Sequence, residues 1–256
     1  MTSAATPKSS GAGLRIAVLQ HEPQTGLGAF SGLLDKAGVE YEVFETGWAA
    51  PLPDIDWFDG AIVLGGSLGA HEPALLEPRR WIRDAALRNT PILGICLGGQ
   101  LLARALGGFV GRGSRPEVGV TDIYLTDAAR RDPLFGDLPR RFPAFSWHAD
   151  AFRLPRRAIP LAGSIAYEHQ AFRFGANAYA LQFHPEVRPD DLARWSAVPG
   201  YQDLLERAGA DWGDVMSALE FATPELDTLA GHLIEAWLCL VAGAAAARER
   251  QSRVAV

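Results

Sequence analysis

A cysteine flanked by glycines lies between a short apolar run and a helix-like pattern, an arrangement typical of a nucleophilic catalyst. The segment reads Gly94-Ile-Cys96-Leu-Gly98, after the apolar residues 91–93 and before the helical pattern of residues 100–106. A Gly-x-nucleophile-x-Gly sequence between a strand and a helix predicts a nucleophile elbow, a turn too tight for side chains beside the nucleophile. The N-terminus of the following helix favours the thiolate form of Cys96.

The best candidate for a base that activates this thiol is His184. It ends the apolar run 179–183, where its side chain can reach the carboxyl edge of a sheet, and Pro185 stops the strand. Glu186 follows two residues after His184, an offset that lets its carboxylate fold back onto the imidazole and fix the tautomer. An isolated histidine at a strand end is more often a solvated or capping residue. Beside the elbow, we interpret Cys96, His184 and Glu186 as a catalytic triad.

A pair of glycines, Gly65 and Gly66, follows the apolar run 60–64 and is a candidate oxyanion site. Backbone N–H groups can hold the negative oxygen that forms during acyl transfer. The N–H of Leu97, next to the nucleophile, would be the first donor and the glycine pair would supply the second. A glycine pair alone is more often a plain turn, but this pair precedes the elbow by one strand-and-helix unit.

The remaining histidines and the second cysteine carry less information. His148, in the segment 146–150, lies at another predicted strand end, where a place in a substrate pocket and a structural role are equally consistent with the sequence. Cys239 lies on the apolar stripe of the last predicted helix, and we expect it to be buried. We predict no cofactor and no metal site. The remaining histidines are not spaced in the chain as metal ligands usually are; they are His21, His71, His169 and His232.

These residues need a sheet whose strands end at one edge, and the first half of the chain predicts such a sheet. Apolar or alternating runs at 14–20, 41–45 and 60–64 indicate strands, and helical patterns occur at 29–37 and 78–87. Alternation of strands and helices predicts an α/β fold, with a mainly parallel sheet and helices on both faces.

The pattern changes after the elbow and its helix. Residues 107–115 are rich in glycine and arginine and are predicted to form a loop. Short strands with turn residues between them follow at 118–125, 142–148, 159–167, 170–174 and 178–183. We expect them to add an antiparallel or mixed section to the parallel core. Helices are predicted at 189–195, 201–208 and 224–247, followed by a frayed end at 251–256.

Length and composition indicate a globular protein. The chain has 256 residues, 48% of them hydrophobic and 21% charged, which is enough to bury a sizeable core. We predict a disordered leader at 1–13, a catalytic domain at 14–196 and a helical extension at 197–256 packed on the same domain. The net charge of −6 argues against nucleic acid or an anionic membrane as a partner, and we expect no apolar run long enough to span a bilayer. With only two cysteines, a cytoplasmic location is expected.

Three segments together resemble the class I, triad-type glutamine amidotransferase family. They are residues 94–100, the loop at 64–66, and the Gln-Phe-His-Pro-Glu segment at 182–186. The resemblance extends from about residue 14 to residue 194, and the Gly-x-Cys-x-Gly and His-Pro-Glu pair is highly specific in this order. Within the family, the chain is similar to the stand-alone, GMP-synthase-like branch. The resemblance implies a flavodoxin-like α/β fold.

The resemblance also implies a glutaminase half-reaction. Cys96 would attack the side-chain amide of glutamine and form a γ-glutamyl thioester, which water then hydrolyses to glutamate. His184 would take the thiol proton and give it to the departing ammonia, while Glu186 orients His184. The backbone N–H groups of Gly66 and Leu97 would hold the oxyanion.

Substrate residues are implied in the same way. Gln100 and the backbone of His148, Ala149 and Asp150 match positions that hold glutamine in the family. Two departures bear on the substrate, since the family usually has proline where this chain has Ser67, and His-Gly-Asp where this chain has Ala149 in the middle.

Three functions stay open. The first is an amidotransferase that supplies ammonia to a separate synthetase, because we find no nucleotide-binding fingerprint after residue 190. The second is a self-sufficient hydrolase of γ-glutamyl peptides or amides that uses the same triad. The third is a non-catalytic binding or regulatory protein, against which the complete Cys-His-Glu set argues.

Overall fold

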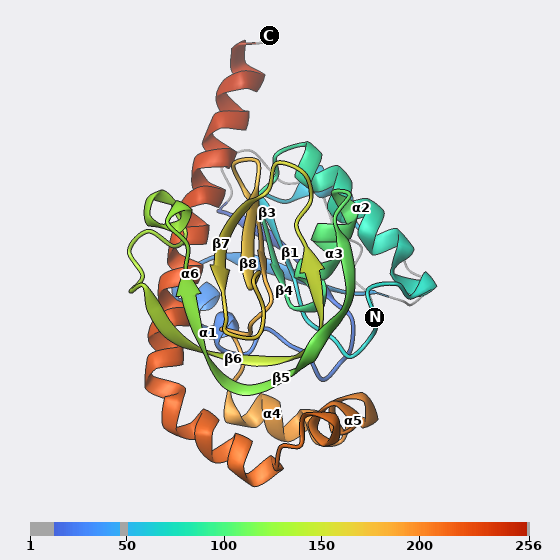
Figure 1. Cartoon of the computed structure of the whole chain (residues 1–256). Helices are drawn as coiled ribbons and strands as arrows, with labels where there is room; N and C mark the ends of the chain where they lie inside the picture. The colour runs from blue at the N-terminus through green and yellow to red at the C-terminus, as the bar shows by residue number, and fades with distance from the viewer. Residues whose placement is uncertain (1–12, 47–50, 255–256) are drawn as a thin grey trace.

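The computed structural model describes residues 13–46 and 51–254, so the predicted leader, apart from Gly13, lies outside the described residues. Within these residues one sheet has the strand order β2-β1-β3-β4-β9-β8-β7-β5-β6 (Figure 1). The strands are β1 (Arg15–Gln20), β2 (Glu40–Glu45), β3 (Gly60–Val63), β4 (Ile92–Ile95), β5 (Phe109–Leu125), β6 (Arg141–Arg153), β7 (Ile159–Gly163), β8 (Ala171–Phe174) and β9 (Ala178–Leu181). The α-helices are α1 (Ala29–Lys36), α2 (Leu76–Leu87), α3 (Leu97–Ala105), α4 (Pro189–Trp195), α5 (Pro199–Ala208) and α6 (Trp212–Val254).

The sheet has a parallel half and an antiparallel half. β1 pairs in parallel with β2 and β3, and β4 pairs in parallel with β3 and β9. From β9 the neighbours are antiparallel, through β8 and β7 to the ribbon of β5 and β6. The predicted α/β fold, a parallel core with an added antiparallel section, is confirmed. The carboxyl ends of the parallel strands share one edge, where ligands bind in sheets of this kind.

Helices cover both faces of the parallel half (Figure 1). Ile16 and Val18 of β1 belong to the apolar cluster that contains α1 and α6 residues. Ala17 and Leu19 belong to the cluster that contains α2 and α3 residues. Because successive side chains of a strand point to opposite faces, a strand buried on both sides is an uninterrupted apolar run.

The predicted loop at 107–115 is wrong, because most of it opens strand β5. Arg112 is paired with Asp150 of β6, and a register shift separates this pair from the pairing of Glu117 with His148. Glycine and arginine suggested a loop. An antiparallel ribbon with a bulge tolerates glycine, and here it leaves the arginines exposed to solvent.

Helix α6 begins at Trp212, well before the predicted start at Pro224, and continues to Val254, beyond its predicted end. Proline lacks an N–H and usually marks a helix start or a kink. Here the residues on both sides of Pro224 continue one buried stripe, with members three or four residues apart as in a helix packed on a core. The stripe consists of Val215, Leu219, Ala222, Leu226, Leu229, Leu233, Trp237 and Val241.

Two further expectations for α6 are also wrong. Cys239 is exposed, because Leu238 and Val241 lie on the buried side and each helical residue is rotated by about 100° from the one before it. The second expectation was that no apolar run would be long enough to span a bilayer. The segment Trp212–Gln251 is long and apolar enough to cross a membrane, by length and composition only. In the most apolar window of this segment, 39% is buried inside the protein.

Helices α4 and α5 and the first part of α6 lie next to the β5–β6 ribbon (Figure 1), and a third apolar cluster joins them to it. The rings of Trp195 and Tyr201 are stacked with their centroids 4.6 Å apart, and Trp147 of β6 meets both edge-on. Trp195 also contacts the ring of His184, at a centroid distance of 5.3 Å. The cluster therefore holds α4 and α5 beside the segment that follows β9.

Candidate active site

Cys96 lies on a strained turn between β4 and α3. Its φ is 47°, a left-handed conformation that residues other than glycine rarely adopt. Steric contacts require the flanking glycines. A Cβ at Gly98 would lie 2.0 Å from the carbonyl oxygen of Val63, and one at Gly94 would lie 2.8 Å from the carbonyl oxygen of Gly98. The turn that presents the thiol therefore needs glycine two residues before and two residues after Cys96.

A buried histidine and glutamate lie next to this thiol. Nδ1 of His184 is 2.7 Å from Oε1 of Glu186, and both side chains are almost fully buried. The backbone N–H of His184 donates to the carbonyl of Phe145 at 2.7 Å, which fixes the chain at the end of β9. A Cβ at Gly65 would lie 2.8 Å from Cε1 of His184 and 3.6 Å from Cβ of Cys96, so the imidazole and the thiol are neighbours. The structure thus brings the three predicted triad residues together.

These neighbours set the charge of His184. Burial lowers the pKa of its imidazole, but attraction to Glu186 and Cys96, with the hydrogen bond to Glu186, outweighs burial and raises the pKa to about 10. His184 is therefore an imidazolium at neutral pH. Because Nδ1 is held by Glu186, the other ring nitrogen is left for the sulfur of Cys96.

The two predicted oxyanion glycines lie beside this pair, at the end of β3. A Cβ at Gly65 would be 2.8 Å from Cε1 of His184, so the glycine makes room for the imidazole, a steric requirement that sequence analysis missed. A Cβ at Gly66 would be 3.1 Å from Cδ2 of Leu97. Gly66 and Leu97 are therefore neighbours, as two donors converging on one oxygen need to be.

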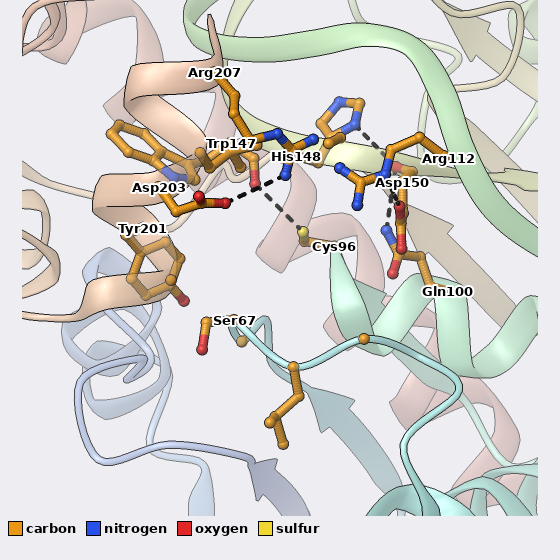
Figure 2. Close-up of a pocket in the computed structure, with 16 residues that line it drawn as sticks. Ser67, Cys96, Gln100, Arg112, Trp147, His148, Asp150, Tyr201, Asp203 and Arg207 are labelled. Carbon is orange, nitrogen blue, oxygen red and sulfur yellow. Dashed lines mark hydrogen bonds and ion pairs between the residues drawn. The ribbon is translucent and has the colours of Figure 1, made fainter.

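A pocket of about 280 Å³ opens beside Cys96 (Figure 2). Of the predicted site residues, the structure places Gly66, Gln100, His148, Ala149 and Asp150 on its wall. Gly65, Leu97, His184 and Glu186 are not among its lining residues and lie in the buried layer. Among the residues that the structure describes, no group of three or more His, Cys, Asp or Glu could hold a metal ion.

A chain of hydrogen bonds connects Gln100 to the thiol. Nε2 of Gln100 donates to the carbonyl of Asp150 and to Oε1 of Gln182, both at 3.3 Å. Nε2 of Gln182 donates in turn to Sγ of Cys96 at 3.5 Å. Sequence analysis assigned no role to Gln182. Its closeness to His184 in the chain was an available signal, because both residues directly follow strand β9.

The His148 side chain is held by a buried carboxylate. Nε2 of His148 lies 3.2 Å from Oε2 of Glu117, and Nδ1 lies 3.1 Å from the carbonyl of Asp150. Glu117 also accepts hydrogen bonds from Ser164, at 2.7 Å, and from Gln170. Burial raises the pKa of Glu117, but these hydrogen bonds and His148 lower it below its usual value. Nothing in the sequence identified Glu117, because its position depends on the bulge in β5.

Comparison with known proteins assigns the family. The model of the class-I glutamine amidotransferase family matches residues 32–193, which are well over half of the chain and include Cys96, His184 and Glu186. The chain belongs to the class I glutamine amidotransferase family.

The relatives of this family member come from several organisms. A glutamine-hydrolysing GMP synthase subunit of Methanocaldococcus jannaschii is 36% identical over 130 residues, which are 50% of this chain and 64% of that one. The glutamine amidotransferase-like protein YfeJ of Salmonella typhimurium is 30% identical over 182 residues, 68% of this chain and 76% of that one. The crystal structure of a glutamine amidotransferase from Thermotoga maritima has 30% identity and a TM-score of 0.78, covering 90% of this chain and 99% of that one. The match spans 27% of the GMP synthase of Aeropyrum pernix and 64% of the Methanocaldococcus jannaschii subunit.

The structure explains one departure of this chain from the family pattern. The N–H of Ser67 donates to Oε1 of Glu22 at 2.8 Å, and its hydroxyl donates to the same oxygen at 2.5 Å. Proline at this position would have no N–H to donate. Gly200, at the start of α5, lies against Ser67, since a Cβ at Gly200 would be 3.1 Å from Cβ of Ser67. For Ala149, the structure shows only that it lines the pocket.

Helix α5 forms a wall of the pocket that sequence analysis missed. Each of its contributing residues is three or four positions from at least one other, which places them on one side of the helix. They are Gly200, Tyr201, Asp203, Leu204 and Arg207. A helical pattern was visible in the sequence, but the cavity that it faces depends on how α5 packs against Trp147 and Trp195.

Proposed function

We propose that this chain hydrolyses the side-chain amide of glutamine with Cys96 as the nucleophile, releasing ammonia and glutamate. The proposal depends above all on one observation: Cys96, on its strained turn, lies next to His184, whose Nδ1 is held by Glu186 at 2.7 Å. Membership of the class I glutamine amidotransferase family supports the same reaction.

In the proposed first step, the thiolate of Cys96 adds to the amide carbon of glutamine. The His184 imidazolium stabilises the thiolate and then gives its proton to the nitrogen as the C–N bond breaks. Glu186 keeps Nδ1 protonated, so that the other ring nitrogen faces the reaction. In the second step, His184 takes a proton from water, which attacks the thioester, and the C–S bond breaks to release glutamate.

The proposed oxyanion donors are the N–H groups of Gly66 and Leu97. Removing one donor of this kind costs an enzyme about 3 kcal/mol of transition-state stabilisation. Gln100 and the backbone of residues 148–150 are proposed to hold the amino-acid end of glutamine. Their positions on the pocket wall, and the hydrogen bond from Gln100 to the carbonyl of Asp150, support this assignment.

A second candidate function is the hydrolysis of γ-glutamyl peptides or amides by the same triad. The observation that favours it is the wall formed by α5, where Tyr201, Asp203 and Arg207 line the pocket beyond the residues assigned to glutamine. A hydrolase of this kind needs no partner protein.

Under the first function, the ammonia acceptor is proposed to be a separate synthetase. The relative named as one subunit of a glutamine-hydrolysing GMP synthase supports that kind of partner. We also propose a cytoplasmic location, because both cysteines are free thiols and a reducing compartment keeps them so.

The test is the release of glutamate and ammonia from glutamine by the purified chain. Cys96→Ala is expected to abolish release, because no other group can form the thioester. Cys239→Ala is the matched control, since it removes the exposed thiol on α6 and is expected to retain activity. Substantial activity in Cys96→Ala would show that the nucleophile is wrongly assigned.

A further inference from the structure

The pocket has two sides, and Cys96 lies between them (Figure 2). Gln100, Arg112 and Asp150 lie on one side, which the proposed function assigns to the glutamyl part of the substrate. Ser67 and the α5 residues lie on the other side (Figure 2). Glutamine releases only ammonia from its amide, so a larger leaving group would find room on this second side.

Helix α5 is held firmly in this position. Gly200 packs against Ser67 so closely that an added Cβ would come within 3.1 Å of the serine Cβ. One residue later, the Tyr201 ring is stacked on Trp195 with an interplanar angle of 8°. Trp195 in turn contacts the ring of His184. The second side of the pocket is therefore built on the same aromatic cluster that supports the proposed base.

Tyr201 offers a hydroxyl that the described part of the protein does not satisfy. The residue is 5% exposed, and its buried hydroxyl has no hydrogen-bond partner among the described residues. Burial raises the pKa of Tyr201 well above its usual value, so the hydroxyl keeps its proton. A buried hydroxyl without a partner is costly, and such groups in native proteins usually have a ligand or water to bond.

Arg207 adds a cation to the same side. Its guanidinium lies 3.4 Å from Asp203, four residues earlier on α5, and both side chains line the pocket and are partly exposed. A solvent-exposed pair at this spacing is weak. The guanidinium can therefore turn to an incoming carboxylate, which it can bind through two parallel hydrogen bonds.

We infer that the α5 side of the pocket is a subsite for the leaving group of γ-glutamyl amino acids, with Arg207 binding the carboxylate of the released amino acid. The Tyr201 hydroxyl, which points toward Ser67 (Figure 2), would bond a different polar atom of the same leaving group. This inference rests on the second candidate function. Cys96 would attack the γ-carbonyl carbon, the C–N bond would break, and the His184 proton would go to the amino-acid nitrogen. Water would then cleave the thioester, releasing glutamate and restoring the thiol.

Two substrates of equal length isolate the carboxylate. γ-Glutamylglycine carries it, and γ-glutamylglycinamide replaces it with an uncharged amide. We expect the wild-type chain to have a kcat/KM for γ-glutamylglycine about tenfold higher than for the amide, a typical effect of one charge-assisted pair. Arg207→Gln should bring the ratio close to one, and Arg207→Lys should restore part of it. The exposed Arg156, absent from the pocket wall, provides the control variant Arg156→Gln, which should keep the wild-type ratio.

Tyr201→Phe tests the hydroxyl separately. It should lower kcat/KM for γ-glutamylglycine more than for glutamine, because only the dipeptide reaches α5. Equal turnover of the dipeptide and its amide, or an unchanged ratio in Arg207→Gln, would overturn the subsite. Turnover of glutamine without turnover of either conjugate would also overturn it, while leaving the glutaminase proposal intact. Failure to hydrolyse all three substrates would contradict both.

Discussion

Nε2 of His148 lies 3.2 Å from Oε2 of Glu117, beneath the backbone that forms one wall of the pocket. His148 also bonds the carbonyl of Asp150, so the carboxylate supports the segment proposed to hold glutamine. Glu117→Gln removes the negative charge and leaves a single amide oxygen to accept the hydrogen bonds that the two carboxylate oxygens accept in the wild type. We expect KM for glutamine to rise about tenfold with a smaller change in kcat, equivalent to about 1.4 kcal/mol of binding.

A steady-state kinetic comparison checks this expectation. Glu168→Gln makes the same chemical change at an exposed position and should leave both constants unchanged. If Glu117→Gln lowers kcat and leaves KM unchanged, Glu117 acts on the chemical step and the positioning role is wrong.

The raised pKa of His184 predicts how the thiol reacts at different pH values. Because the His184 imidazolium persists up to about pH 10 and lies next to Cys96, we expect Cys96 to react with iodoacetamide already at pH 6. Glu186→Gln removes the charge that holds the proton on His184, so reactivity at pH 6 should fall severalfold. The measurement uses Cys239→Ala as the background, so that only Cys96 is alkylated. An alkylation profile identical in the two proteins would count against Glu186 as the partner.

His21 predicts an acid sensitivity of the fold. Burial lowers its pKa to about 4, and its Nε2 has no hydrogen-bond partner among the described residues. In the unfolded chain the histidine pKa is near 6.5, so as pH falls the unfolded chain binds the proton before the folded chain does. The contribution of His21 to the free energy of unfolding is therefore fully present above pH 6.5 and is lost as pH falls toward 4. The loss amounts to about 3 kcal/mol at most.

The variant His21→Asn tests this expectation, because an amide can still bond Thr46, the partner of Nδ1. Urea unfolding at pH 7 and at pH 4 should show a smaller loss of stability in the variant than in the wild type. An equal loss in both proteins would exclude His21 as a source of the acid sensitivity.

The glycine requirement at the Cys96 turn can be tested against a glycine that has space around it. Gly98→Ala would place a Cβ 2.0 Å from the Val63 carbonyl oxygen, so we expect it to lower the free energy of unfolding by about 3 kcal/mol or more. Gly32 in α1 has no atom within 4 Å of an added Cβ. Gly32→Ala should therefore stabilise the helix by about 0.5–1 kcal/mol. Equal effects of the two substitutions in thermal unfolding would contradict this reading of the turn.

The sequence predicted best where a local pattern carries its own geometry. The glycines around Cys96 are required by backbone contacts, and the two-residue offset of His184 and Glu186 suffices to bring their side chains together at 2.7 Å. Buried parallel strands were predictable because they are continuous apolar runs. In each case the physical cause acts within a few residues.

Features that depend on distant packing could not be predicted in this way. Glu117 reaches His148 only because a bulge shifts the register of β5. Helix α5 reaches the pocket because Tyr201 stacks on Trp195. The exposure of Cys239 follows from which face of α6 meets the sheet, a choice that a helix rich in apolar residues on several sides leaves open.

The most direct measurement of the central claim is the covalent labelling of the chain by a diazo-ketone analogue of glutamine. Intact-protein mass spectrometry followed by peptide mapping locates the adduct. If Cys96 is the nucleophile of a glutaminase, we expect one adduct, on Cys96, and no modification of the exposed Cys239. Excess glutamine should prevent this adduct, and Cys96→Ala should abolish it. No adduct, or labelling of Cys239 that glutamine does not prevent, would contradict the claim that Cys96 attacks a γ-glutamyl carbonyl.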